Sequence, residues 1–249
     1  MTTLDRCVRH IAYGALALLV TTALASDAER DRLRTIVQQQ CLPHWMEANS
    51  AAPCVSLHLF SDGPNAAGFA VLPDRKGGAH YLLIPTRTIS GIESQEVRSP
   101  SSPNYFDAAW EAREVLNGAA GRALQRTEIG LAVNAVRSRS QDQLHIHIEC
   151  LSRLLYEALK AGAARIGNQW SAIQVHGWPY QTMRVMGTGL GTQNPFELLA
   201  DGVPGARDVM GSYTLLVAGM EFNEGPGFVL LAGVDGPGAE HLLDSTCAV

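Results

Sequence analysis

The sequence lacks an excess of positive charge. Its 249 residues include 19 lysines and arginines against 24 aspartates and glutamates, so the formal net charge at pH 7 is -5. Proteins that bind polynucleotides collect phosphates with a basic surface, which this composition does not supply. A nucleic-acid partner is therefore not expected, whereas a nucleotide or a phosphorylated small molecule is compatible with the charge.

The apolar run near the N-terminus is short for a transmembrane helix. Arg6 and Arg9 precede this run, which extends from Ile11 to Ala25 and ends in Ala23-Leu24-Ala25. A helix of that length spans about 22 Å, whereas the hydrocarbon core of a bilayer is roughly 30 Å thick. We therefore interpret residues 1–25 as a secretory signal with an A-x-A cleavage site, and a retained N-terminal membrane anchor is the alternative. Both interpretations place residues 26–249 outside the cytoplasm.

No pair among the five cysteines has the C-x-x-C spacing that is typical of zinc sites, so a cysteine-based zinc centre is not predicted. Removal of the leader with Cys7 leaves an even number, which indicates two disulfides in an oxidising compartment. Three pairings are possible. We favour Cys41 with Cys54, because the proline-containing segment between them is short, and this leaves Cys150 for Cys247. Four unpaired buried thiols are the alternative.

The chain also lacks a long linker, and its length allows one large or two small globular domains. Strand pairs with interspersed helices indicate an α+β fold with a mainly antiparallel sheet and flanking helices. The pieces GFAVLP…HYLLIP and SYTLLVAG…GFVLLAG are similar, which leaves open a diverged duplication that makes the C-terminal third a second half. The patterns predict helices over 27–40 (ended by Pro43), 105–116, 151–164 and 195–199, and strands over 55–60, 68–72, 81–85, 129–134, 144–150, 171–175, 181–185, 213–218 and 227–232.

Two histidines alternate with isoleucines in the segment QLHIHIEC, residues 143–150. In a β-strand, this alternation turns His145, His147 and Glu149 to one face and the isoleucines to the other. The polar face is a solvated sheet face, a metal site with these three residues as ligands, or a site of nucleophilic catalysis by histidine on phosphorus. The other histidines, His80 among them, show no metal-ligand spacing. Polar residues in the preceding loop are candidates to hold phosphate oxygens: Arg137, Ser138, Arg139, Ser140 and Gln141.

The segment QLHIHI resembles the His-φ-His-φ-His-φ signature of the histidine-triad (HIT) superfamily, in which φ is apolar. The strand YLLIPT resembles the "IP" strand of that superfamily, and Asn134 with Gln141 resembles its nucleotide-contacting Asn…Gln pair. Taken in order, the pieces QCLP, PCV, GFAVLPDRKG, YLLIPTRTISGIES, NYFDAAWEAR, SRSQDQLHIHIEC, PFELLADGVPGARDVMG and GFVLLAG resemble the bacterial CDP-diacylglycerol pyrophosphatases. This resemblance covers nearly all of the chain after the leader.

The resemblance implies a HIT-like hydrolase domain over residues 26–249 that splits the pyrophosphate of CDP-diacylglycerol into CMP and phosphatidate, without a cofactor or metal. It implies His145 as the nucleophile and His147 as a residue that orients the phosphate. The first histidine of the triad is replaced by Gln143, which forms hydrogen bonds but carries no proton charge at neutral pH. The implied substrate-binding residues are Asn134 for the nucleotide and Ser140, Gln141 and Gln143 for phosphate oxygens.

The substrate implied by the resemblance is a lipid, so a membrane surface is an expected partner, and the expected location is the periplasm or the periplasmic side of the inner membrane. The acyl chains require an apolar surface near the site, for which large aromatics are candidates, although such residues more often belong to the core: Trp110, Trp170, Trp178 and Phe196. The alternatives are a broader nucleotide pyrophosphatase or nucleotidyl transferase, a non-catalytic nucleotide- or lipid-binding protein, and a metal-dependent enzyme.

Overall fold

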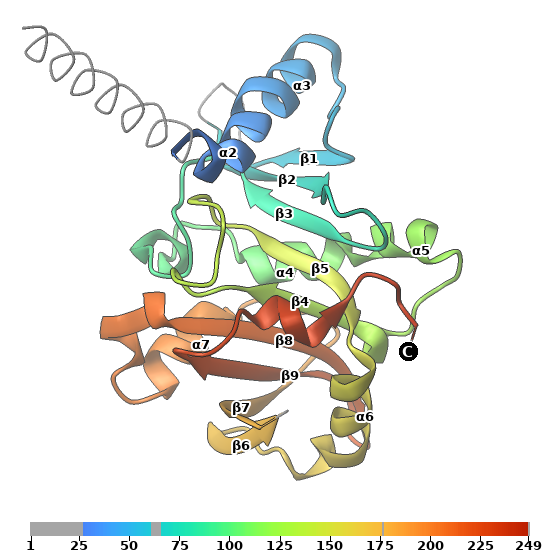
Figure 1. Cartoon of the computed structure of the whole chain (residues 1–249), viewed down its shortest axis with the longest axis vertical. Coiled ribbons are helices and arrows are strands. Elements are labelled where there is room, and N and C mark those ends of the chain that lie inside the picture. The colour runs from blue at the N-terminus through green and yellow to red at the C-terminus, as the bar shows by residue number, and fades with distance from the viewer. Residues whose placement is uncertain (1–26, 61–65, 176, 249) are drawn as a thin grey trace, which may run out of the picture.

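The computed structural model describes residues 27–60, 66–175 and 177–248, and its centre is a single sheet (Figure 1). Its strands are β1 (Ser56–Leu59), β2 (Gly68–Pro73), β3 (Tyr81–Pro85), β4 (Ile129–Val133), β5 (Ile146–Leu151), β6 (Ser171–Val175), β7 (Trp178–Met186), β8 (Tyr213–Phe222), β9 (Gly225–Val234) and β10 (Leu243–Asp244). Their order in the sheet is β1-β2-β3-β5-β4-β8-β9-β7-β6, with β10 paired to the end of β5. Every one of these pairs is antiparallel, which confirms the predicted fold class.

Helical segments flank the sheet on both faces. They are α2 (Arg32–Ile36), η1 (Val37–Cys41), α3 (Leu42–Ala48), η2 (Gln95–Arg98), α4 (Tyr105–Glu111), η3 (Ala112–Glu114), α5 (Val115–Ala120), η4 (Arg126–Glu128), α6 (Arg153–Gly162), η5 (Ala163–Arg165), α7 (Pro195–Gly202), η6 (Ala206–Ser212) and η7 (Ala239–Leu242). Helices α4, α5 and α7 cover one face, where they form the largest hydrophobic core with Ile146 and Ile148 of β5.

The opposite face has two separate covers with a gap between them. The N-terminal helices pack on β1 to β3 through Leu33, Val37 and neighbouring side chains. Helix α6 and η7 pack on β4, β8 and β9 through Leu155, Leu159 and Leu242. The central strand β5 lies between these two cores, because it pairs with β3 on one side and with β4 on the other. A polar site on this face of β5 is therefore flanked by two apolar walls.

One strand order occurs twice in the sheet. The strands β2-β3-β5-β4 and the strands β6-β7-β9-β8 follow the same path, and β4 pairs with β8 where the two units meet. In the first unit, helical segments connect β3 to β4, and in the second unit, helical segments connect β7 to β8. The common order is compatible with the duplication considered from the sequence, which stays a prediction. Val229 and Leu231 of β9 lie on the same face of the sheet as the histidines of β5. The second unit therefore has apolar side chains where the first has histidines.

The N-terminal helical segment is longer than predicted. Pro43 does not end it at Gln40, because α3 continues to Ala48. A π-helical turn, η1, interrupts the usual hydrogen-bond pattern, and Pro43 then falls into the first turn of α3, where the absence of an N–H group costs little. The predicted strand over 181–185 is likewise too short, since β7 begins at Trp178. The leader predicted over residues 1–25 lies outside the described residues.

The two disulfides have the favoured pairing. Cys41 is bonded to Cys54, which ties η1 to the segment before β1. Cys150 is bonded to Cys247, which ties the end of β5 to the last residues of the chain. Disulfides of this kind are typical of proteins in oxidising compartments. Within the described ranges, no helix has both the length and the apolar character needed to cross a bilayer.

Replacement of Cys150 and Cys247 by alanine is expected to lower the free energy of unfolding more than replacement of Cys41 and Cys54. The first bond joins residues 97 apart and the second joins residues 13 apart, and the constraint on the unfolded chain grows with loop length, to roughly 4 to 5 kcal/mol against about 3 kcal/mol. Urea unfolding of the parent and of both double variants measures the difference. An equal or larger loss in the Cys41 and Cys54 variant would contradict this ranking.

Candidate active site

The two histidines of the QLHIHI segment are buried on the face of the sheet that lies between the two apolar walls. His147 lies opposite Leu82 of β3 and Ala132 of β4 in the strand register. His145 immediately precedes β5, and its Nδ1 lies 2.7 Å from the backbone carbonyl oxygen of Gln143. A carbonyl oxygen only accepts, so Nδ1 carries the hydrogen and the lone pair of the neutral ring is on Nε2. The predicted alternation of faces along this segment is confirmed.

A third histidine, which the sequence analysis did not select, completes the cluster. Nε2 of His80 lies 2.9 Å from Nδ1 of His147 and 3.0 Å from a carboxyl oxygen of Glu149. His80 directly precedes β3, and the pairing of Tyr81 with Ile148 brings it beside Glu149. The sequence places His80 directly before the strand YLLIP, which is a weak indication of a site residue. Only the register of β3 on β5 shows that it lies beside His147 and Glu149.

The same cluster contains the ligand atoms that could hold a metal ion. One atom each from His80, His147 and Glu149 lies within 4.8 Å of the others, and all three residues are buried. The metal-site alternative considered from the sequence combined Glu149 with His145 and His147. The structure instead groups Glu149 with His147 and His80.

Burial determines the charge state of the cluster. It lowers the pKa of His145 and of His80, and it lowers that of His147 well below the ordinary value, with a further contribution from the two neighbouring imidazoles. Burial also raises the pKa of Glu149 to about 8, and the negative charge of Glu240 acts in the same direction. At neutral pH, the three rings are therefore neutral and Glu149 is largely protonated.

The other residues predicted to bind substrate have different positions in the structure. Asn134, Ser140 and Gln141 line the same cavity as the two histidines of the segment. However, Gln141 accepts a hydrogen bond from the backbone N–H of Leu33 and donates one to the carbonyl oxygen of Glu29. The amide of Gln143 donates to two carbonyl oxygens after β3. Both glutamine side chains thus contact backbone, and their predicted phosphate roles stay predictions.

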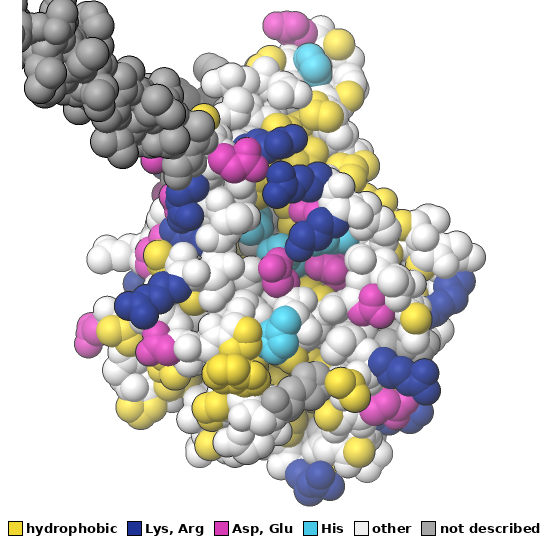
Figure 2. All heavy atoms as spheres, in the orientation of Figure 1, with side chains coloured by type: hydrophobic (Ala, Val, Ile, Leu, Met, Phe, Trp, Pro, Cys, Tyr) yellow, Lys and Arg dark blue, Asp and Glu magenta, His cyan; other side chains and the backbone are white. Residues whose placement is uncertain are grey.

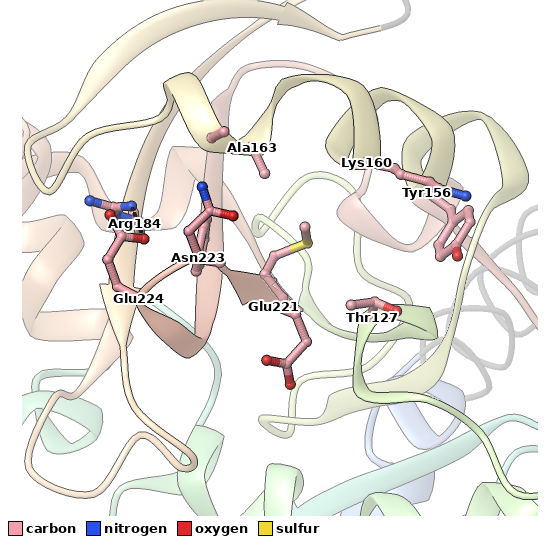
Figure 3. A pocket seen from close by; sticks show the side chains of 11 residues that line it. Thr127, Tyr156, Lys160, Ala163, Arg184, Glu221, Asn223 and Glu224 are labelled. Carbon is pink, nitrogen blue, oxygen red and sulfur yellow. Dashed lines mark hydrogen bonds and ion pairs between the residues drawn. The ribbon is translucent and has the colours of Figure 1, made fainter.

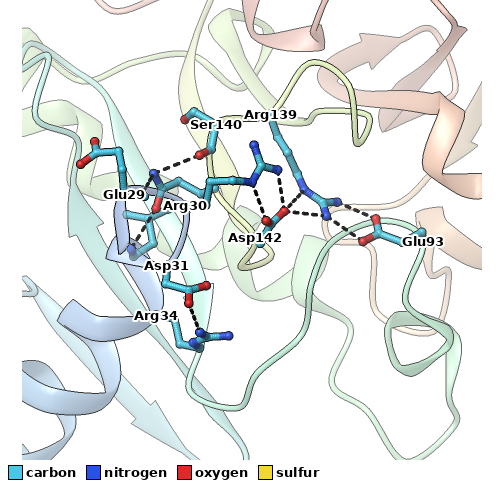
Figure 4. A network of polar contacts seen from close by, with 10 residues as sticks. Glu29, Arg30, Asp31, Arg34, Glu93, Arg139, Ser140 and Asp142 are labelled. Atoms are coloured by element: carbon cyan, nitrogen blue, oxygen red, sulfur yellow. Dashed lines mark hydrogen bonds and ion pairs between the residues drawn. The ribbon is translucent and has the colours of Figure 1, made fainter. Parts of the chain in front are cut away.

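A network of ion pairs holds the loop before His145 (Figure 4). Asp142 accepts two hydrogen bonds from Arg30, at 2.6 and 2.7 Å, and two from Arg139, at 3.1 and 3.3 Å. Arg139 also forms a bidentate pair with Glu93, in space that a side chain at Gly91 would occupy. The side chain of Arg139 is only 6% exposed, and its guanidinium is fully engaged in this network. The network therefore links the N-terminal helical segment, the loop and the β3–α4 connection.

The cavity beside the histidines has a volume of about 820 Å³. His145, His147 and Asn134 form its floor, and residues of the N-terminal helices and of the β2–β3 turn form its rim, together with Glu240 of η7. Figure 2 shows histidine side chains in the hollow with both basic and acidic side chains around it. Among the lining residues, Arg32 and Lys76 form no ion pair within the described part of the chain. These cations are available for an anionic ligand.

An exposed apolar surface borders this cavity, and Figure 2 shows hydrophobic side chains gathered below the hollow. We define the apolar surface by Val136, Trp178, Val209 and Val234, all of which are exposed. Val136 and Val209 line a shallow pocket of about 270 Å³ that shares Ser138 with the histidine cavity. Of the four aromatics considered for contact with acyl chains, Trp178 is exposed. Trp110 and Phe196 are fully buried, and Trp170 packs on the core while its indole N–H donates to the carbonyl oxygen of Leu198.

A further pocket of about 370 Å³ lies near the ends of β8 and β9 (Figure 3). Lys160 and Tyr156 of α6 face the hairpin residues Glu221 and Glu224 across it. Glu224 forms an ion pair of 3.4 Å with Arg184. No histidine is among its lining residues, so this pocket is separate from the cluster on β5.

Fold and site together define a class of protein: an antiparallel α+β protein with a buried pair of neutral histidines on a central strand, beside a cavity of the size that binds nucleotide-like ligands. A family model described as CDP-diacylglycerol pyrophosphatase matches residues 28–249. The chain is 39% identical to a CDP-diacylglycerol pyrophosphatase of Yersinia pestis, over 99% of this chain and 97% of the relative. The chain therefore belongs to the CDP-diacylglycerol pyrophosphatase family, which confirms the family and the enzyme class, a diphosphatase, predicted from its sequence.

The replacement Glu149→Gln is expected to stabilise the protein in a pH-dependent manner. The pKa of Glu149 is about 8 in the folded protein and about 4.3 in an unfolded chain. As pH rises between these values, only the unfolded state loses the proton, so the free energy of unfolding falls. Glutamine does not titrate, so the variant lacks this loss of unfolding free energy. The gain in melting temperature over the parent should be small at pH 5 and largest at pH 8.

Thermal melts at pH 5, 6.5 and 8 measure this gain, with Glu157→Gln on the exposed face of α6 as the matched control. A difference between the Glu149→Gln variant and the parent that stays constant over this pH range would contradict the assignment of a protonated, buried carboxyl group.

Proposed function

We propose that the chain hydrolyses the pyrophosphate of CDP-diacylglycerol with His145 as the nucleophile. The hydrogen bond between Nδ1 of His145 and the carbonyl oxygen of Gln143 is the observation that carries this proposal. It keeps the lone pair on Nε2, which is the form that attacks phosphorus. Burial lowers the pKa of this imidazole, so the ring is neutral and nucleophilic at neutral pH.

The reaction has two steps. First, Nε2 of His145 forms a bond to the phosphorus attached to cytidine, and the bond from that phosphorus to the bridging oxygen breaks. The electron pair leaves with phosphatidate, and a cytidylyl-histidine intermediate forms. Water then attacks the same phosphorus and releases CMP, which regenerates the free imidazole. This division of one displacement into two steps is the general advantage of covalent catalysis.

The surroundings of His145 support binding of a pyrophosphate. Arg32 and Lys76 on the rim of the cavity supply positive charge for its oxygens. Nε2 of His147 is buried, has no hydrogen-bond partner among the described residues and lies 3.5 Å from a carboxylate oxygen of Glu240, which the phosphate has to displace in this proposal. In this proposal Asn134 contacts the nucleotide and Ser140 contacts a phosphate oxygen. The side chains of Gln141 and Gln143 bond to backbone groups and hold the loop that leads to His145. Catalysis in this scheme uses no metal ion.

The replacement His145→Ala is expected to reduce CMP release from CDP-diacylglycerol in detergent micelles by at least about 1,000-fold, because the nucleophile is lost. The assay contains a chelator, and His58→Ala on the exposed strand β1 is the matched control. Loss of all turnover on addition of the chelator would favour a metal-dependent enzyme.

The remaining outcomes distinguish the other functions. Faster CMP or AMP release from soluble CDP- or ADP-linked compounds than from the lipid would favour a broader nucleotide pyrophosphatase. Binding of CDP-diacylglycerol without turnover in the parent protein would favour a binding protein, and the glutamine at position 143 would then mark the loss of catalysis.

We infer that the acyl chains of the substrate and the membrane surface contact the apolar surface formed by Val136, Trp178, Val209 and Val234. This surface lies next to the cavity, and the shared lining residue Ser138 makes the two continuous. A diacyl substrate whose pyrophosphate reaches His145 needs an apolar region within reach of its glycerol group. Val136 and Val209 line the same pocket and Trp178 lies beside its Gly236, and a cluster of exposed hydrophobic side chains is otherwise unfavourable. The inference further places the domain on the periplasmic side, consistent with its two disulfides.

The double replacement of Trp178 and Val209 by serine is expected to raise KM for long-chain CDP-diacylglycerol in micelles by about tenfold, through the lost burial of apolar area. Hydrolysis of a dibutanoyl analogue that is monomeric in water should change by less than twofold. Met46→Ser, which removes an exposed apolar side chain from α3, serves as the control. Equal effects on both substrates would show that this surface does not contact the acyl chains.

A further inference from the structure

The cavity beside the histidines contains an acidic side chain at the place where the proposed function puts a phosphate. We propose that Glu240 is a specificity-determining residue, which admits phosphate groups with a single negative charge and disfavours those with two. The diphosphate of the substrate, esterified at both ends, is of the first kind, and the phosphate of CMP is of the second. This inference rests on the proposed function for the place of the phosphate.

Glu240 lies within reach of both histidines of the QLHIHI segment. One of its carboxylate oxygens lies 3.5 Å from Nε2 of His147, and Glu240 lines the same cavity as His145. Burial lowers the pKa of His145, whereas the hydrogen bond to Gln143 and the negative charge of Glu240 act against this shift. The charge of Glu240 therefore acts at the atom that attacks phosphorus in the proposed reaction.

The backbone of η7 holds Glu240 at the cavity. The N–H group of Glu240 donates to Oδ1 of Asn134 at 3.4 Å. Ala239 and Leu242 on either side are buried in the core between η7 and the sheet, and the carbonyl oxygen of Leu242 accepts a hydrogen bond from the N–H group of Ser152. The Glu240 side chain itself is 37% exposed. A phosphate that displaces the carboxylate from His147 therefore turns this side chain aside, and the negative charge stays at the cavity.

The cavity has no surplus of positive charge to offset that carboxylate. Four acidic and three basic side chains line it. Of the basic ones, Arg75 pairs with Glu29, whereas Arg32 and Lys76 form no ion pair within the described part of the chain. These two cations match a diphosphate that carries one charge on each phosphorus. A further negative charge on the ligand would lie near Glu240 without a partner.

Substrate and product differ in charge at the phosphorus that is attacked. In CDP-diacylglycerol this phosphorus is bonded to the ribose oxygen and to the bridging oxygen, so a single negative charge remains on its other oxygens. In CMP it is a monoester, whose second ionisation has a pKa of about 6, so it carries close to two charges at neutral pH. Repulsion grows in proportion to the charge of the ligand. Glu240 therefore disfavours the product more than the substrate and promotes release of CMP.

The test measures binding of two soluble ligands by isothermal titration calorimetry at pH 7.5. These are CMP and its methyl ester, in which the phosphate carries only one charge. Glu240→Gln retains the size of the side chain and removes its charge. It is expected to lower the Kd for CMP by about tenfold and the Kd for the methyl ester by about threefold, because repulsion scales with ligand charge. Both changes should shrink at about 0.5 M salt, which screens partly exposed charges.

Two further variants and a kinetic readout complete the test. Glu157→Gln on the exposed face of α6 removes a negative charge far from the cavity, and both Kd values should stay within about 1.5-fold of the parent. Glu240→Asp retains the charge, so the ratio of the two Kd values should stay within about twofold of the parent. In assays of CDP-diacylglycerol hydrolysis, the inhibition constant of CMP should fall by about tenfold in Glu240→Gln.

The inference is overturned by a Kd for CMP that is unchanged or higher in Glu240→Gln, provided that its melting temperature shows a folded protein. It is also overturned by an equal change for both ligands, because the side chain would then act through its contacts and not through its charge. If neither ligand binds the parent or the variant, this inference and the proposed function both fail. An inactive parent that shows the expected changes in binding would contradict the proposed function alone.

Discussion

The pairing of β5 with β3 and β4 is the constraint on which the rest of the site depends. A strand with neighbours on both sides has no freedom of register, because a shift by one residue would turn its isoleucines out of the large core and its histidines into it. The cost of such a shift fixes His147 between Leu82 and Ala132. The two apolar cores on the histidine face then leave a gap at this strand, so that the polar side chains of β5 lie between two hydrophobic walls.

Around this strand, the groups that orient the imidazoles differ from the groups that supply positive charge. The hydrogen bonds that orient the imidazoles come from the backbone of Gln143 and from His80, both of which are buried. The positive charge comes from Arg32 and Lys76 on the rim, which is open to water. Neutral rings inside and cations outside avoid the large cost of burying unpaired charge. The one buried arginine near the site, Arg139, is paired with two carboxylates and serves the loop.

The sequence predicted the local features of the fold well, because they depend on local patterns. Alternation of side chains identified β5 and its two faces, and the short proline-containing segment between Cys41 and Cys54 indicated their bond. Features that depend on distant contacts were not accessible. Pro43 was predicted to end the helix because the π-helical turn before it has no recognisable sequence pattern. His80 was passed over because only the register of β3 on β5 brings it to His147, and Arg139 looked like a phosphate ligand until its two carboxylate partners were located.

The walls of the site come from opposite ends of the described chain. The N-terminal helices provide one rim, and Glu240 of η7 provides another, held in place by β10 and by the bond from Cys150 to Cys247. During synthesis, His145 is therefore made long before the cavity around it is complete. The rim is complete only when η7 has been made and packs beside the sheet. A nascent chain that has not reached η7 consequently carries the histidines without the part of the rim that Glu240 provides.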